Sequence, residues 1–231
     1  MMRERMNSAV FDLRRSAIRE FAKLAKQTPG CISLTLGEPD FDTPAPVRKQ
    51  AELSLESGET HYIENNGLKA LREKIAFFET DRNGFACTED QVIVTAGATE
   101  ALFVSLFGVL NPGDEVIIPT PAFVLYEEIV KLCRAKPVLL DTRPDGFQIR
   151  KSALESLVTE KTKAIVINSP NNPTGTVLDI ESLNAVRVTA RAKNLFVICD
   201  DVYRQLIYTD SYHSFTEFED VRDRTILVQS Y

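Results

Sequence analysis

Short apolar runs alternate with helical hydrophobic periods along most of the chain. Runs rich in β-branched residues predict strands at 92–95, 115–118, 137–140, 164–168, 196–199 and 226–228. Helical patterns fill the segments between several of these runs, at 98–110, 123–133 and 180–193. Because the strand cores are apolar on both faces, the pattern predicts a parallel sheet covered by helices on both sides, which is an α/β fold.

The N-terminal part of the chain has a different pattern. Ile18, Phe21 and Leu24 form one apolar stripe and predict a helix, and the proline in Thr43-Pro44 predicts the first turn of another. A third helix follows Gly67. No internal repeat or Gly/Ser linker interrupts the chain. We therefore predict an arm with a helix over residues 1–30 and one larger domain over residues 31–231.

Composition excludes several classes of function. The net charge of −6 argues against a general binder of nucleic acid. Four widely spaced cysteines and two histidines argue against a metal site or a disulfide framework, and they favour the cytoplasm. No apolar run approaches the roughly 18 residues of a membrane span, and residues 1–7 do not resemble a signal peptide. We expect a cytoplasmic protein without a metal, a membrane partner or a nucleic-acid partner.

Unusual residues gather where the predicted strands end. Such groups occur at Gly97, 119–123, 168–175, 200–203 and Ser230. Ligands of open α/β sheets bind along the edge formed by the carboxyl ends of the strands. Packing alone does not explain this distribution, so the sequence predicts a ligand site at that edge.

Asp200, Tyr203 and Asn172 carry the most specific chemistry in this group. A carboxylate directly after a buried strand is costly to desolvate unless it has a partner, and a protonated pyridine nitrogen is such a partner. Tyr203 and the amide of Asn172, in the turn 168–175, suit a phenolic oxygen on the same ring. Taken singly, they could be a helix cap, a core tyrosine and an Asn-Pro turn. A cis bond is expected at Ser169-Pro170 or Asn172-Pro173, in that tight turn.

Together these motifs resemble the class I/II aminotransferases, the fold-type-I enzymes that use pyridoxal 5'-phosphate (PLP). The resemblance covers residues 32–231 and implies a three-layer αβα large domain with a mostly parallel sheet. In this family Asp200 would contact the pyridine nitrogen, and Asn172 and Tyr203 would bond the 3'-oxygen of the cofactor. These three residues are the catalytic candidates, because the groups that bond the cofactor tune its ionisation.

The resemblance assigns further residues. It places the phosphate at Gly97, Ala98, Thr99 and Ser230, and the pyridine ring against Phe123. It gives Gly37, in the segment 36–41, a contact to the substrate carboxylate. It also matches Tyr62 to a tyrosine that reaches the phosphate in the other subunit, which implies a homodimer. Plainer interpretations are a strand–helix junction, a core phenylalanine and a tyrosine packed beside a loop.

The family places its Schiff-base lysine directly after the strand that ends near Tyr231. We therefore expect these 231 residues to be a truncated aminotransferase without that lysine and without the C-terminal small domain, inactive by itself. The implied reaction moves an amino group between an α-amino acid and a 2-oxo acid. A PLP-dependent lyase for C–S cleavage or γ-elimination and a non-catalytic aminotransferase-like protein remain alternatives. A nucleotide-binding protein is least favoured, because the chain has neither G-x-G-x-x-G nor a P-loop lysine.

Overall fold

The computed structural model of the chain describes all residues except 1–4, 12, 14–16, 38–40 and 210–211. The chain divides into two compact units. The larger unit combines Met1–Leu13 with Asn66–Tyr231, and the smaller one is Arg14–Asn65. Most of the candidate site residues belong to the larger unit.

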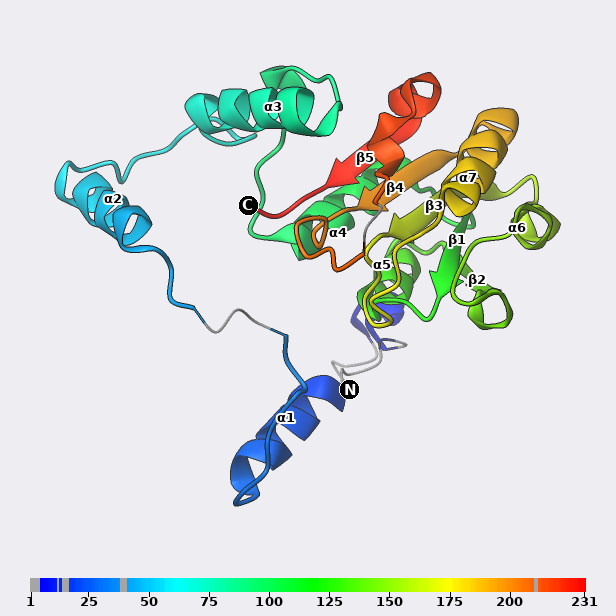
Figure 1. The fold of residues 1–231 in the computed structure, drawn as a ribbon, viewed down its shortest axis with the longest axis horizontal. Coiled ribbons are helices and arrows are strands. Elements are labelled where there is room, and N and C mark those ends of the chain that lie inside the picture. The colour runs from blue at the N-terminus through cyan, green and yellow to red at the C-terminus, as the bar shows by residue number, and fades with distance from the viewer. Residues whose placement is uncertain (1–4, 12, 14–16, 38–40, 210–211) are drawn as a thin grey trace. The chain divides into compact units, whose positions relative to one another are not determined.

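A parallel sheet forms the centre of the larger unit (Figure 1). Its order is β2-β1-β3-β4-β5 in the part of the chain that the structure describes. The strands are β1 (Glu115–Thr120), β2 (Lys136–Asp141), β3 (Thr162–Asn168), β4 (Phe196–Asp200) and β5 (Thr225–Val228). Because all the strands are parallel, their carboxyl ends share one edge. The winding reverses between β1 and β3, which is where ligands of such sheets bind.

Helices cover both faces of this sheet. The helices of the larger unit are α3 (Lys69–Asn83), α4 (Ala98–Val109), α5 (Leu125–Leu132), α6 (Lys151–Leu157) and α7 (Ile180–Lys193). Among its described residues, the 3-10 turns are η2 (Ser8–Val10), η3 (Glu89–Gln91), η4 (Arg143–Asp145), η5 (Phe215–Glu217) and η6 (Glu219–Arg224). Helices α4 and α5 supply side chains to one buried cluster, and α6 and α7 supply side chains to another.

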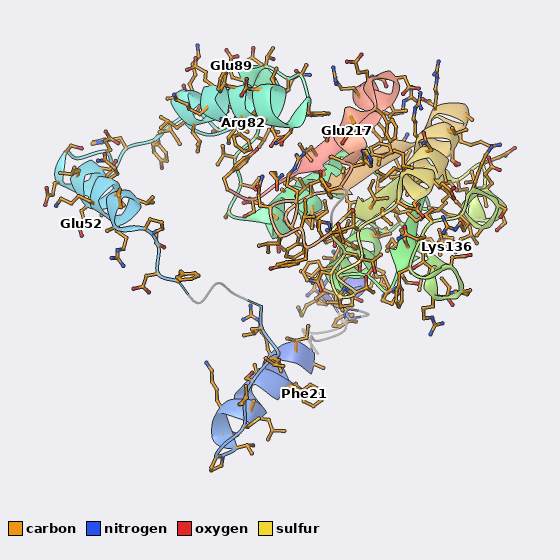
Figure 2. The ribbon with its side chains drawn as sticks, viewed as in Figure 1. Phe21, Glu52, Arg82, Glu89, Lys136 and Glu217 are labelled. Carbon is orange, nitrogen blue, oxygen red and sulfur yellow. The ribbon has the colours of Figure 1, made fainter. Side chains whose placement is uncertain are left out.

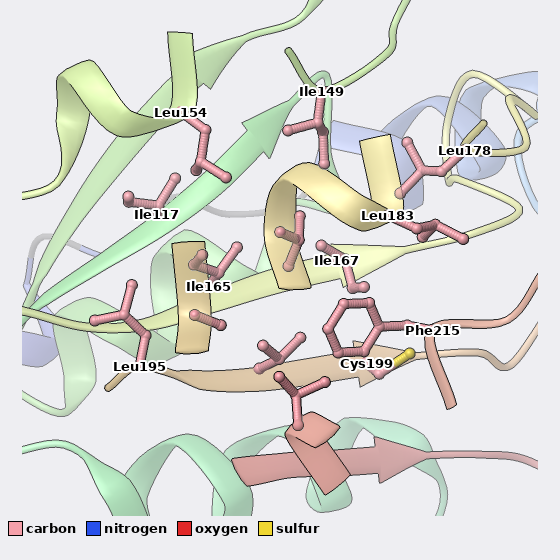
Figure 3. Close-up of a cluster of buried hydrophobic side chains, with 14 of the residues drawn as sticks. Ile117, Ile149, Leu154, Ile165, Ile167, Leu178, Leu183, Leu195, Cys199 and Phe215 are labelled. Atoms are coloured by element: carbon pink, nitrogen blue, oxygen red, sulfur yellow. The ribbon is translucent and has the colours of Figure 1, made fainter. Parts of the chain in front are cut away.

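The strands contribute alternate residues to these two clusters. In β3, Ile165 and Ile167 pack with Leu183 of α7 and with Phe215 (Figure 3). Their neighbour Val166 belongs to the opposite cluster, with the α4 and α5 side chains. A strand that is buried on both faces must be apolar at successive positions, which is the pattern that the sequence shows. The predicted α/β fold, with a parallel sheet between two helical layers, is therefore confirmed.

The predicted strand at 92–95 is wrong, because this segment is not part of the sheet. Its backbone makes a hydrogen bond from the Val94 N–H to the Asn66 carbonyl oxygen at 3.0 Å, and Ile93 is largely exposed. A run of β-branched residues favours an extended backbone, whereas a strand also needs a neighbouring strand with which to form a ladder.

The smaller unit contains α1 (Ala17–Gln27) and α2 (Ala45–Glu56). The predicted stripe of α1 is present, but its side chains are exposed within the described residues, and Phe21 stands out from the helix (Figure 2). Helix α2 begins directly after Pro44, with Pro46 in its first turn. Both helices therefore form where the sequence predicts them.

None of the described helices is long and apolar enough to cross a membrane. All four cysteines are free thiols.

Candidate active site

Asp200 is the last residue of β4, and only 3% of its surface is exposed. Its carboxylate accepts a hydrogen bond from the Tyr126 hydroxyl at 2.6 Å and a long one from the Val202 N–H at 3.4 Å. Burial raises the pKa of Asp200, and the bond from Tyr126 opposes this rise. No basic side chain of the described residues forms an ion pair with Asp200. The site thus presents a buried carboxylate that a cationic ligand would stabilise.

Asn172 and Tyr203 come together beside this carboxylate. The Asn172 side-chain amide donates to the Tyr203 hydroxyl at 3.4 Å. Asn168, at the end of β3, fixes both strand ends: its amide donates to the Asp200 carbonyl at 2.7 Å, and its Oδ1 accepts from the Asn172 N–H at 2.7 Å. The structure therefore unites the three predicted catalytic candidates through one asparagine that the sequence analysis did not select.

The turn after β3 has the predicted proline geometry. Both Ser169-Pro170 and Asn172-Pro173 are cis. The Asn171 N–H also donates to the Thr176 carbonyl at 2.9 Å, and the Gly175 N–H donates to the Asn171 carbonyl at 2.7 Å. These bonds close the turn on itself, so the backbone that carries Asn172 is well defined.

Gly97, Ala98 and Thr99 form the start of α4. Gly97 is its N-cap with φ 82°, a conformation that favours glycine, and open space lies where a Cβ would be. None of the described residues accepts a hydrogen bond from the Ala98 or Thr99 N–H. Glu100 folds back to accept the Ala96 N–H at 2.5 Å. The helix terminus therefore offers free N–H donors of the kind that bind phosphate.

Phe123 and Ser230 lie after the ends of two other strands. Phe123 follows β1, is partly buried, and its ring meets the Tyr126 ring edge to face at 5.7 Å. Ser230 follows β5 and is exposed. Asn168, Asp200 and Val228 are paired in register across β3, β4 and β5. Ser230 comes shortly after Val228, which is level with Asp200. Ser230 therefore lies at the same edge of the sheet.

Tyr62 and Gly37 belong to the smaller unit, which is described by itself. The Tyr62 side chain is fully exposed, and Gly37 is exposed beside residues 38–40, which lie outside the described part of the chain. Their roles in a site remain predictions.

A small cavity lies at the ends of β1 and β3. Its walls include Pro119, Tyr126, Asn168 and Asn171. Its volume of ≈ 20 Å³ is enough for about one water molecule and far too small for a cofactor. This cavity therefore does not hold a cofactor-sized ligand.

Tyr126 is a second residue of this candidate site that the sequence did not single out. The sequence favours a core position, and Tyr126 is indeed only 2% exposed. Its hydroxyl, however, bonds a carboxylate 74 residues away in the chain. The sequence contained one signal for this contact: a tyrosine at a core position needs a hydrogen-bond partner for its hydroxyl.

Replacing Tyr126 with phenylalanine tests this contact. We expect the pKa of Asp200 to rise further, because the bond that lowers it is lost. A raised carboxyl pKa removes stability as pH rises through it, so Tyr126→Phe should lose about 1–3 kcal/mol at pH 7. The deficit should shrink as pH falls through the raised pKa of Asp200 toward the usual aspartate pKa, because the carboxyl is then neutral in both proteins. Urea unfolding at several pH values and NMR titration of the Asp200 carboxyl check this, with exposed Tyr208→Phe as the control.

The fold and the site together define a class: an αβα protein with an acid, an amide and a phenol at the carboxyl edge of its sheet. Residues 29–231 match the family described as aminotransferase class I and II. The chain belongs to this family, because the match covers most of its length.

Individual relatives agree with this assignment. A putative aminotransferase from Bacillus subtilis, YugH, is 40% identical over 98% of this chain and 59% of its own length. An aspartate aminotransferase from Pyrococcus horikoshii is 38% identical over 95% of this chain and 56% of its own. The crystal structure of the Thermotoga maritima aspartate aminotransferase has a TM-score of 0.91 and 36% identity, over 97% of this chain and 61% of that one. The chain thus spans about three fifths of the length of these relatives.

Proposed function

We propose that residues 31–231 supply most of the large domain of a PLP-dependent aminotransferase, after an N-terminal arm over residues 1–30. The reaction moves an amino group between an α-amino acid and a 2-oxo acid. One observation carries the proposal: buried Asp200, without a cationic partner among the described residues, lies at the strand ends beside the Asn172–Tyr203 pair. Similarity to aspartate aminotransferases of known structure supports it.

The residues at this edge fit PLP. A protonated pyridine nitrogen would supply the positive charge that the Asp200 carboxylate lacks, and this pairing would reverse the effect of burial on its pKa. The Asn172 amide and the Tyr203 hydroxyl suit an anionic phenolic oxygen. The free N–H groups of Ala98 and Thr99 suit a phosphate, because they lie at the positive end of the α4 dipole.

Each of these residues has a separate task in the proposed reaction. When bound, PLP supplies an electron-withdrawing ring that stabilises negative charge on the substrate carbon next to the amino group. Asp200 holds a proton on the ring nitrogen, and Tyr126 keeps the Asp200 carboxylate in place. Asn172 and Tyr203 donate hydrogen bonds to the phenolic oxygen. Phe123 would lie against the ring, while Gly97, Ala98, Thr99 and Ser230 would hold the phosphate.

We extend the proposal to the smaller unit and to the whole protein. Gly37 would contact the substrate carboxylate, and Tyr62 would reach the phosphate of a partner subunit in a homodimer. The full exposure of the Tyr62 side chain within its own unit is consistent with such a partner. A cytoplasmic location agrees with the four free thiols.

Proton transfer in this proposal belongs to the family lysine expected directly after Tyr231. The test uses the protein isolated from its natural source. The protein is treated with PLP and then with borohydride, its intact mass is measured, and amino acids are screened for transamination. We expect transaminase activity and a pyridoxyl group on a lysine that follows Tyr231. A protein of only 231 residues, with no adduct and no activity, would support the non-catalytic alternative instead.

A further inference from the structure

Glu79, on α3, is a buried carboxylate that the proposed reaction does not use. Only 3% of its surface is exposed. Its two oxygens have different partners: Oε1 accepts from the Tyr231 hydroxyl at 2.7 Å, whereas Oε2 accepts from Arg204 at 3.3 Å and from the Asn83 amide at 2.9 Å. One side chain of α3 therefore holds the segment after β4 and the segment after β5.

Arg204 connects Glu79 to the turn that carries Tyr203. Its guanidinium lies between Glu79 and Asp201, 3.9 Å from the Asp201 carboxylate, and both Arg204 and Asp201 are buried. The backbone of the turn closes through the Arg204 N–H to the Asp201 carbonyl at 3.0 Å and the Leu206 N–H to the Tyr203 carbonyl at 2.8 Å. Fixing the Arg204 side chain thus restrains the backbone on either side of Tyr203.

Asp201 is fixed from its other side as well. Ser214 Oγ donates to it at 2.7 Å, and the Cys199 thiol donates to it at 3.0 Å. The Asp201 N–H also donates to the Val228 carbonyl at 3.0 Å, which connects the turn to β5. Asp201 and Arg204 therefore form a rigid base, to which Glu79 adds the contact from α3.

Tyr231 brings the second segment to the same carboxylate. Its ring meets the Phe78 ring edge to face at 5.9 Å, and its hydroxyl bonds Glu79. Ser230, the predicted phosphate contact, is its direct neighbour. Glu79 is thus one residue removed from two cofactor candidates, Tyr203 through Arg204 and Ser230 through Tyr231.

Stability alone does not account for this cluster. Two carboxylates and one guanidinium are withdrawn from water, and buried ion pairs of this kind are often no more stable than apolar residues of similar volume. Such a cluster instead fixes orientations, because each hydrogen bond sets the direction of its partner side chain. We therefore expect the role of this cluster to be the orientation of the residues at the sheet edge.

We propose that Glu79 is a positioning residue that holds the Tyr203 turn and the Ser230 segment in place for the cofactor. This inference rests on the proposed function for the identity of the ligand. It predicts two effects that are measured separately. One is the order of the two segments in the cofactor-free protein, and the other is the affinity of the protein for PLP.

The test compares Glu79→Leu with the unmodified 231-residue chain. In the cofactor-free protein we expect hydrogen exchange at the Arg204 and Leu206 amides to speed up by about tenfold, because the restraint from α3 is lost. Titration with PLP, followed by absorbance, should show about tenfold weaker binding. Glu79→Gln should recover most of both effects, since its amide can still accept from Arg204 and donate to the Tyr231 oxygen.

A double-mutant cycle separates positioning from general destabilisation. In a Tyr203→Phe background, Glu79→Leu should weaken PLP binding by less than about threefold, because part of its effect passes through the Tyr203 hydroxyl. Glu73→Leu is the matched control on the same helix, where Glu73 is half exposed and lies 3.8 Å from Lys69. It should change neither exchange nor affinity.

Tyr231→Phe serves as a second variant if Glu79→Leu does not fold. It removes one hydroxyl and should loosen the backbone after β5 while leaving the Arg204 and Leu206 amides protected. Folded Glu79→Leu protein with normal exchange and normal PLP affinity would overturn the inference. If the unmodified chain binds no PLP but Glu79→Leu still loosens both segments, the proposed function fails while the positioning role of Glu79 is supported.

Discussion

Asp200→Asn is expected to weaken the binding of PLP to the 231-residue chain by about 10- to 100-fold. The reason is that a hydrogen bond to a charged group contributes about 1.5–3 kcal/mol, and every 1.4 kcal/mol is a factor of ten in affinity. The asparagine keeps the shape of the side chain and an acceptor for Tyr126, so the change isolates the charge. Titration with PLP followed by absorbance measures the effect, with Asp223→Asn, at an exposed acid in the η6 turn, as the control.

The same variant should have the opposite effect on the protein without cofactor. Because burial raises the pKa of Asp200, its ionisation removes stability as pH rises above the usual aspartate pKa. Cofactor-free Asp200→Asn should therefore be at least as stable as the unmodified chain at pH 7, and this advantage should disappear in acid. Urea unfolding at pH 3 and pH 7 checks the sign. Equal PLP affinity of both proteins would show that Asp200 does not face the pyridine nitrogen.

Such opposite effects are expected where a fold carries a ligand site. A buried carboxylate with no cationic partner among the described residues is unfavourable in the free protein. A cationic ligand would supply the missing positive charge and so stabilise the bound protein. The neighbouring Asn168, Asn172 and Tyr203 are linked to one another by hydrogen bonds, so the surroundings of Asp200 are fixed before any ligand arrives. The site therefore combines a stable frame with one unfavourable charge.

Local sequence signals predicted much of this frame. The helix over residues 180–193 has the same bounds in the structure, because Asp179 caps its N-terminus through the Ser182 N–H and Asn194 ends it in a left-handed conformation. The sheet followed from strands that are apolar on both faces. The strand at 92–95 failed because pairing depends on a neighbour, which a local pattern does not contain.

Local signals did not predict contacts between residues that are far apart in the sequence. Tyr126 meets Asp200 across 74 positions, and Glu79 meets Arg204 across 125. A single sequence shows that these residues are polar or aromatic, and it does not show which of them share a place in the fold. Asn172, Tyr203 and Asp200 were selected because their chemistry suits one ligand and because they follow predicted strands whose ends share an edge, and the family resemblance gave their roles.

Arg204→Met is expected to have the largest effect on stability, with a loss of about 3–5 kcal/mol in the free energy of unfolding at pH 7. Arg204 is the only basic group that the described residues place between the carboxylates of Glu79 and Asp201. Methionine preserves much of the side-chain volume, but it leaves both buried acids without a positive partner. Urea unfolding measures the loss, and Arg143→Met, at an exposed ion pair with Asp141, should change little.

The pH dependence of this loss identifies its cause. Burial raises the pKa of Asp201 and Arg204 opposes the rise, so removing Arg204 should raise that pKa further. The deficit of Arg204→Met should then be largest at neutral pH and shrink as pH falls through the raised pKa of Asp201 toward the usual aspartate value, because Asp201 is then neutral in both proteins. Adding Glu79→Leu should recover part of the loss, because one of the two unpaired charges is removed. A deficit that is independent of pH and unaffected by Glu79→Leu would instead assign the role of Arg204 to packing.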